Sequence, residues 1–372
     1  MKKFQISLFL ILFSIVFLYG FAVGNFQIFP YDLLQNFKNS FPSEIDSQSF
    51  SNNSLSAYEV DSYLKIKNID DLLQKRQNLI HHIWKTQEIP TSVPFLIEEN
   101  ISDERYSDLQ NLKGISKITS KMDFEVTSIA YLFESVSSNG ELVIYHQGHR
   151  GDFILGKNTI ESLLENGYSV LSFSMPLMGM NNQPLVHTES FGPITLNSHN
   201  KLQFIETNDF SPIKFFVEPI YVSLNYVDQQ YTFTKYHFIG ISGGGWTAII
   251  YSSIDDRISN TFSVAGSLPI FLREDPKDLG DYEQINPKLY SIANYLEMYV
   301  MSSYGENRNT TLIYNKFDPC CFDGNSSLIF LEPVQKTLNQ LEKGDFDIII
   351  DDTTNKHEIS EYSLNQILKL MK

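Results

Sequence analysis

Cysteine is almost absent from this chain of 372 residues, which contains only the adjacent pair Cys320 and Cys321. Small secreted domains that depend on disulfides carry several spaced cysteines, so this pattern excludes a disulfide framework. The pair can be two buried thiols or, more rarely, a strained vicinal disulfide. Two adjacent cysteines also make a poor metal site, and we expect no metal. The folded state must therefore be stabilised by a hydrophobic core.

Positive charge is also scarce. The chain has 28 Lys and Arg against 44 Asp and Glu, a net charge of −16, and no Lys- or Arg-rich run in its body. Nucleic acids and anionic lipids attract clustered cationic side chains, so we expect no nucleic-acid partner. The chain also lacks a repeat period and a long low-complexity tract, and its 42% hydrophobic content suffices for one large core.

One long apolar run is present, at the N-terminus. Two lysines precede residues 6–23, a stretch long enough to cross a bilayer. Positive residues on the N-terminal side hold that end in the cytoplasm and send the remainder across. The small residues Ala22 and Gly24 would also suit a signal peptidase. We therefore expect residues 1–24 to be a signal-anchor or a cleaved signal peptide, with the rest membrane-anchored outside the cytoplasm or secreted.

The most informative motif is residues 236–246, YHFIGISGGGW. It combines a short apolar run typical of a buried strand, a glycine-rich turn and the start of an apolar helical segment. Ser242 lies at the apex of the turn between Gly240 and Gly244, in a G-x-S-x-G pattern. A sharp strand-to-helix turn needs neighbours without side chains. The pattern predicts a nucleophile elbow with Ser242 as the nucleophile.

A serine nucleophile needs a histidine to accept its proton. Of the eight histidines, His357 is the one that follows a predicted C-terminal strand, residues 346–350, in a loop before a final helix. His237 lies inside the strand before the serine, where we expect it to point into the packing of the sheet. His146 falls close to the predicted oxyanion loop. His357 is therefore the predicted general base.

A carboxylate must orient that histidine. Asp318 follows the predicted strand 311–314 and precedes Pro319, which pushes it toward extended geometry at the carboxyl edge of the sheet. Its position also fits the chain order serine, acid, histidine. Asp318 is the predicted triad acid. The alternatives are Asp323 and, less favoured, Asp351 and Asp352.

The oxyanion of a tetrahedral intermediate needs two backbone N–H donors. One is expected from the residue after the nucleophile, Gly243, and the other from the loop after the predicted strand 141–146. In that loop Gly148 would allow a close approach to substrate, so we expect His149 to supply the second N–H.

The remaining pattern alternates strands with helical segments, which predicts a mainly parallel, doubly wound sheet with helices on both faces. Residues 25–116 form an N-terminal extension with one amphipathic helix, for which Asn68 or Asp70 could be the cap. The long segment 175–235 includes a predicted helix at 212–229 and could shape a cleft. His187 and His199 in this segment are expected to be exposed.

Together the motifs GISGG, QGH, FDP and NKHE resemble the α/β-hydrolase superfamily of serine hydrolases over residues 117–372. This resemblance implies an α/β-hydrolase fold, acyl transfer through an acyl-serine intermediate, a small-molecule acyl substrate and no cofactor. An esterase is favoured over a peptidase or amidase, because about 90 residues before the fold are too few for the propeller of large prolyl peptidases. A catalytically silent surface-binding protein is the alternative from another class. The motifs leave the oligomeric state open.

Overall fold

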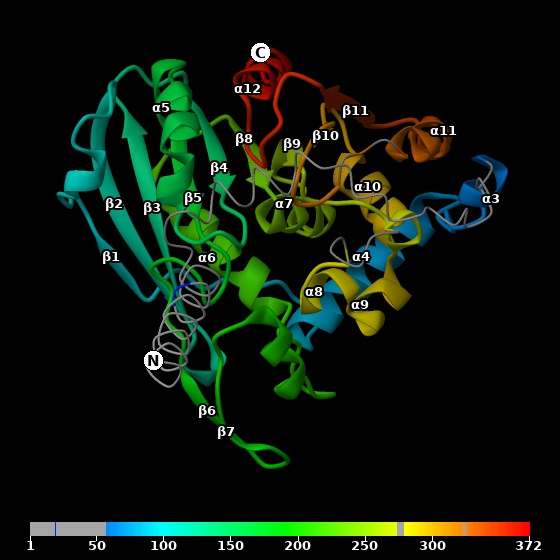
Figure 1. Cartoon of the computed structure of the whole chain (residues 1–372), viewed down its shortest axis with the longest axis horizontal. Coiled ribbons are helices and arrows are strands. Elements are labelled where there is room, and N and C mark those ends of the chain that lie inside the picture. Colours follow the sequence, from blue (N-terminus) through cyan, green and yellow to red (C-terminus); the bar gives the residue numbers. More distant parts are fainter. Residues whose placement is uncertain (1–18, 20–56, 274–278, 323, 325) are drawn as a thin grey trace, which may run out of the picture. The chain divides into compact units, whose positions relative to one another are not determined.

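A nine-stranded sheet organises the part of the chain that the structure describes (Figure 1). The structure is a computed structural model that describes Tyr19 and residues 57–273, 279–322, 324 and 326–372. The strands are β1 (Leu96–Glu98), β2 (Leu112–Lys121), β3 (Thr127–Ser135), β4 (Glu141–His146), β5 (Ser169–Phe173), β8 (Lys235–Ile241), β9 (Ile258–Val264), β10 (Asn309–Asn315) and β11 (Asp345–Asp351).

The sheet is mainly parallel, as predicted. Its order is β1-β2-β3-β5-β4-β8-β9-β10-β11. The six strands from β5 to β11 in this order run parallel to one another, whereas β1, β2 and β3 pair antiparallel at one end and β3 pairs antiparallel with β5. Parallel neighbours place the carboxyl ends of β4, β8, β10 and β11 at one edge, where sites form in such sheets.

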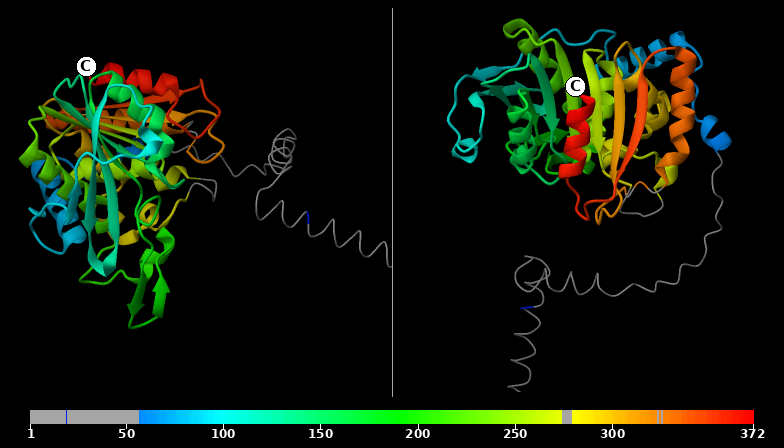
Figure 2. Two further views of the ribbon diagram at one scale, coloured as in Figure 1. Left: turned by 90° about the vertical axis from the view of Figure 1, so that its left-hand side faces the viewer. Right: turned by 90° about the horizontal axis from the view of Figure 1, so that it is seen from above.

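Helices cover both faces of this sheet, again as predicted (Figure 2). The helices are α3 (Ala57–Asp61), α4 (Ile69–Trp84), α5 (Lys157–Glu165), α6 (Lys214–Gln230), α7 (Gly243–Ile254), α8 (Tyr282–Ile285), α9 (Pro287–Ile292), α10 (Tyr295–Ser303), α11 (Leu331–Leu341) and α12 (Glu361–Leu370). Short 3-10 turns are η1 (Glu104–Tyr106), η2 (Asp123–Glu125), η3 (Phe153–Gly156), η4 (His199–Phe204), η5 (Ile270–Leu272) and η7 (Ser327–Phe330).

The alternation of side chains along each strand divides the core into two clusters. In β4, Leu142 and Ile144 face a core shared with α4, α6, α7, α10 and α11. Val143 and Tyr145 face the other core, which α5 and α12 complete. In the right-hand view of Figure 2, α4 (blue) and α12 (red) accordingly lie on opposite sides of the sheet. Both faces of β4 are buried, which explains its continuous apolar run from Leu142 to Tyr145.

The compact unit spans Leu55–Lys372. Its first long helix, α4, is the amphipathic helix predicted from the sequence, and the Asn68 side chain caps it by accepting a hydrogen bond from the N–H of Asp71. No helix in the described residues is long and apolar enough to cross a membrane. The apolar run at residues 6–23 lies outside the described residues except for Tyr19, so the membrane segment stays a prediction.

The long connection between β5 and β8 contains a hairpin, β6 (Leu185–Thr188) and β7 (Gly192–Thr195), followed by η4 and α6. The predicted helix at 212–229 thus corresponds to α6. Folding of this connection brings η4 against α8, which belongs to the connection between β9 and β10. Two segments distant in sequence therefore meet beside the carboxyl edge of the sheet.

Candidate active site

Ser242 lies between the end of β8 and the first residue of α7, with φ 55° and ψ −129°. A positive φ is costly for a residue with a side chain, on the order of 1–3 kcal/mol. The surrounding structure holds the turn in place, in part through a hydrogen bond of 2.9 Å from the Ser242 N–H to the Val264 carbonyl. The Ser242 hydroxyl makes no hydrogen bond to any residue that the structure describes, so it is free to react.

The glycines around Ser242 are required by backbone contacts. A Cβ on Gly240 would lie 2.1 Å from the Gly244 carbonyl oxygen, and a Cβ on Gly244 would lie 2.1 Å from the carbonyl oxygen of His146. Neither backbone atom can move aside as the end of a side chain could. In the loop after β4, a Cβ on Gly148 would lie 2.4 Å from the Ser242 Cβ. The loop after β4 therefore packs directly on the serine turn.

The structure brings His357 and Asp318 together. The His357 Nδ1 lies 2.7 Å from Asp318 Oδ2, and both side chains are buried. The Cys320 N–H donates to the other oxygen, Asp318 Oδ1, at 2.8 Å. The opposite ring nitrogen, His357 Nε2, is buried and has no hydrogen-bond partner among the described residues.

Ser242 and His357 are not hydrogen-bonded to each other. However, His357 and Ile241, the residue before the serine, line the same cavity of about 290 Å³. The His357 side chain and the residue that precedes Ser242 thus face one cavity. Bonds between nucleophile and base are often longer before substrate binds, so this arrangement is compatible with proton transfer.

The other acids are placed differently. Asp351 is buried and accepts hydrogen bonds from Thr353, Ser360 and Ser363, which fix the loop that carries His357. Asp352 is exposed, and Asp323 lies outside the described residues. Asp318 is therefore the described carboxylate that contacts His357.

The two predicted oxyanion donors are adjacent. A Cβ on Gly243 would lie 2.4 Å from the His149 Cε1, so the imidazole stands directly against the first residue of α7. Within the described chain, neither the Gly243 nor the His149 backbone N–H donates a hydrogen bond to a carbonyl or side chain. An oxyanion would need both N–H groups directed at one position beside the serine, and this role of Gly243 and His149 stays a prediction.

His199 is not exposed, contrary to the sequence-based expectation. Its side chain is 0% exposed because η4 packs under α8, while His187 in the hairpin is exposed as expected. His199 joins His149, Asp281 and Glu283 in a cluster whose ligand atoms lie within 4.8 Å of one another. Burial alone would raise the pKa of Glu283, but His199 and His149 lower it well below its usual value. Sequence spacing has no signal for this cluster, since its residues come from three distant segments.

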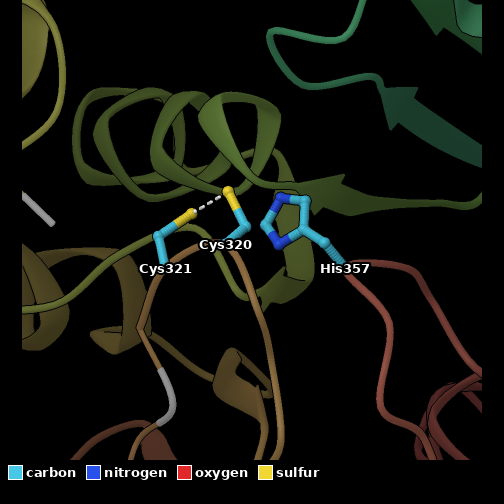
Figure 3. Close-up of side chains that lie close together, drawn as sticks. All are labelled: Cys320, Cys321 and His357. Carbon is cyan, nitrogen blue, oxygen red and sulfur yellow. Dashed lines mark hydrogen bonds between the residues drawn. The ribbon is translucent and has the colours of Figure 1, made fainter. Parts of the chain in front are cut away.

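The two cysteines are thiols, one of the two states expected from the sequence, but their contact with His357 was not predicted. Cys320 and Cys321 are half-buried thiols that are not joined in a disulfide, their sulfurs lie 2.8 Å apart, and Cys320 lies beside the His357 imidazole (Figure 3). The hydrogen bond from Cys321 and the nearby His357 lower the pKa of Cys320 to about 6, although burial opposes this. The two sulfurs and one His357 nitrogen lie within 4.8 Å of one another, so a soft metal ion could also bind here.

His237 points into the packing of the sheet, as expected. It is fully buried, with Nε2 2.9 Å from Glu141 Oε2 and Nδ1 3.0 Å from the Asn260 amide nitrogen. Its role is structural, because it lies at the start of β8, well before the serine turn at the carboxyl end of that strand.

Comparison with solved structures identifies the fold. An acetyl xylan esterase from Thermoanaerobacterium sp. is similar with a TM-score of 0.54 and 11% identity over 86% of this chain and 99% of its own. An acetyl xylan esterase from Paenibacillus sp. has a TM-score of 0.51 and 14% identity over 85% and 99%. An esterase from Pyrococcus furiosus has a TM-score of 0.50 and 15% identity over 75% and 98%. Neither a protein-family model nor a curated protein matches this sequence.

Proposed function

The chain has the α/β-hydrolase fold, and we propose that it is a serine hydrolase that cleaves carboxylic esters. The observation that carries this proposal is the conformation of Ser242, whose φ of 55° and ψ of −129° present a free hydroxyl at the tip of a sharp turn. Strain of this kind persists where function requires it. The esterase activity of the structural neighbours supports an ester substrate.

In the proposed reaction, Ser242 Oγ attacks the ester carbonyl carbon while His357 Nε2 takes the hydroxyl proton. Asp318, bonded to His357 Nδ1, stabilises the imidazolium that forms. The C–O bond to the alcohol then breaks, and the alcohol leaves with the proton from His357. A water molecule, deprotonated by the same Nε2, releases the acid and restores the serine.

The negative charge on the carbonyl oxygen has to be stabilised in both steps. The backbone N–H groups of Gly243 and His149 are the proposed donors. Gly243 follows Ser242, the His149 side chain stands against Gly243, and neither N–H donates a hydrogen bond elsewhere in the described chain. Removing one such donor typically costs about 100–1,000-fold in rate. A fixed backbone donor needs no reorganisation during the reaction. The close packing of Gly148 on Ser242 would hold the loop that carries the His149 N–H in place.

We further propose that the catalytic unit works outside the cytoplasmic membrane, carried there by the apolar segment at residues 6–23. The proposal rests on the length of this segment and the two lysines before it. Protease added to intact cells should then digest the catalytic unit. Digestion that occurs only after the cells are lysed would place the unit in the cytoplasm and contradict this proposal.

A fluorophosphonate probe tests the enzyme proposal. The full chain, purified in detergent, should react with one equivalent of probe, and Ser242→Ala and His357→Ala should abolish labelling. Ser62→Ala, which alters an exposed serine bonded only to the Glu59 carbonyl, is the matched control and should label like the parent. Hydrolysis of p-nitrophenyl acetate should follow the same pattern.

The Cys320→Ser variant distinguishes Ser242 from Cys320 as the group that reacts with the probe. If Ser242 is the nucleophile, this variant keeps its labelling, whereas loss of labelling in Cys320→Ser alone would identify the thiol as the reacting group. A folded parent that neither labels nor hydrolyses esters would refute the proposal and favour a binding protein.

A further inference from the structure

Four potential metal ligands from three distant segments meet beside the serine turn. His149 lies in the loop after β4, His199 begins η4, and Asp281 and Glu283 lie at the start of α8. One ligand atom from each lies within 4.8 Å of all the others. Histidine and carboxylate together are the ligand types that zinc and its neighbours in the first transition row prefer.

Four distances between these side chains are close to those between neighbouring ligands of a metal ion. His149 Nε2 lies 2.9 Å from Glu283 Oε1, 3.1 Å from His199 Nδ1 and 3.4 Å from Asp281 Oδ2. His199 Nδ1 lies 3.2 Å from Glu283 Oε2. In a tetrahedral zinc site with bonds of about 2 Å, neighbouring ligand atoms are about 3.3 Å apart. A small cation would therefore fit once the side chains adjust to direct one atom each at a common centre.

The hydrogen-bond pattern also points to a cation. His199 Nε2 lies 2.8 Å from the Pro176 carbonyl oxygen, which can only accept, so this nitrogen carries the proton. The other ring nitrogen, Nδ1, lies 3.1 Å from His149 Nε2 and 3.2 Å from Glu283 Oε2, so it faces the centre of the cluster. The Glu283 side chain is fully buried, with 0% of its surface exposed, and its Oε2 accepts no hydrogen bond in the described chain. A metal ion bound by Glu283 Oε2 would give this buried oxygen a partner.

Second contacts hold the ligands in orientation. The bond from His199 Nε2 to a backbone carbonyl is the outer contact typical of a metal-bound histidine. The Asn200 side chain donates to Asp281 Oδ1 at 3.1 Å, which leaves Oδ2 directed at His149. With neutral imidazoles, the two carboxylates bring two negative charges to a pocket that no Lys or Arg side chain in the described residues contacts, and a divalent ion would balance them.

We propose that His149, His199, Asp281 and Glu283 bind a divalent transition-metal ion, with Zn²⁺ the best match to two nitrogen and two oxygen ligands. The expectation of no metal rested on the two adjacent cysteines and did not concern these four residues. The bound ion would tie together the loop after β4, η4 and α8. It would thereby brace the loop that carries the proposed oxyanion donor His149, a consequence that rests on the proposed function, whereas metal binding itself does not.

Metal content and affinity test the proposal. The full chain, stripped with EDTA in detergent, should bind one equivalent of Zn²⁺ in calorimetry and should melt at a higher temperature with Zn²⁺ than without it. Co²⁺ should bind with the visible absorption of a four-coordinate ion. Glu283→Gln and His199→Gln should each weaken Zn²⁺ binding by at least about 100-fold, because even outer-shell partners contribute about 10–100-fold.

Controls separate this site from others. His237→Gln removes another fully buried histidine, one bonded to a single glutamate at 2.9 Å, and should leave Zn²⁺ affinity unchanged. Cys320→Ser tests the second cluster and should also have no effect. If Glu283→Gln does not fold, Asp281→Asn provides the test, because its side chain is 38% exposed.

Two outcomes would overturn the proposal. One is a folded parent that binds no Zn²⁺ or Co²⁺ at millimolar concentration. The other is Zn²⁺ binding that persists in the ligand variants and disappears in Cys320→Ser, which would place the ion at the thiols. Neither result depends on esterase activity, so both can be distinguished from a failure of the proposed function.

Discussion

The Asp318→Asn variant tests the proposed triad most directly, because the structure determines how the amide would be oriented. Asp318 Oδ1 accepts a 2.8 Å hydrogen bond from the Cys320 N–H, so an asparagine at this position would keep its oxygen there. Its NH₂ group would then face His357 Nδ1, 2.7 Å away in the parent, and donate to it. The imidazole would have to carry its proton on Nε2 instead.

A histidine protonated on Nε2 cannot accept the proton of Ser242. We therefore expect kcat/KM for p-nitrophenyl acetate to fall about 10,000-fold, or about 5.5 kcal/mol, as in other triads with the wrong tautomer. Unfolding free energy should drop by only about 1–3 kcal/mol, the cost of one unsatisfied amide N–H. The absorbance of released p-nitrophenolate measures kcat/KM, and urea unfolding measures the free energy of unfolding.

Asp352→Asn is the matched control, since it changes an exposed aspartate close in sequence to the histidine loop, and it should leave kcat/KM unchanged. A loss of less than about tenfold in Asp318→Asn, with the protein folded, would refute the reasoning. It would mean that another group orients His357 or that His357 is not the base.

Three further predictions follow from particular contacts. Gly244→Ala should abolish esterase activity and lower the free energy of unfolding by about 3 kcal/mol or more, because the new Cβ would lie 2.1 Å from the His146 carbonyl oxygen. Gly114→Ala is the control, since its Cβ would meet only the end of a side chain, and it should change the free energy of unfolding in urea only slightly. Iodoacetamide should alkylate Cys320 readily at pH 7 and more slowly as the pH falls through about 6, since the thiolate is the reactive form; mass spectrometry showing the same rate at pH 5 and 7 would contradict this. Burial lowers the pKa of His82 to about 4 from 6.5, so on acidification the unfolded chain takes up this proton before the folded chain does. The free energy of unfolding should therefore fall by roughly 3 kcal/mol as the pH drops from 6.5 to 4. His82→Gln should reduce this dependence on pH when unfolding is measured across the same range.

Much of the fold could be predicted because its signals are local. A buried parallel strand needs a short apolar run, and β4 occupies the predicted residues 141–146. The other predicted strands shift by only a few residues at their ends, where strand pairing rather than side-chain pattern decides the boundary. The short edge strand β1 has no such signal, since its burial comes from its neighbour β2.

The site was accessible from sequence in part. The G-x-S-x-G pattern marks the serine turn because only glycine allows the backbone contacts made by Gly240 and Gly244. Asp318 and His357 were predicted from their positions after strands, since parallel strands bring their carboxyl ends to one edge, and the structure brings these two side chains together. The approach of Cys320 to His357 had no such guide, because it depends on how two loops fold against each other.

The sequence by itself therefore determined the alternating strands and helices, the turn around Ser242 and the candidates for its partners, since each depends on residues within a few positions of one another. Only the tertiary structure decided that His199 is buried, that His149 stands against Gly243, and that Glu283, 134 residues from His149, completes their cluster. Contacts over such distances depend on the packing of whole segments, and no local pattern of residues encodes them.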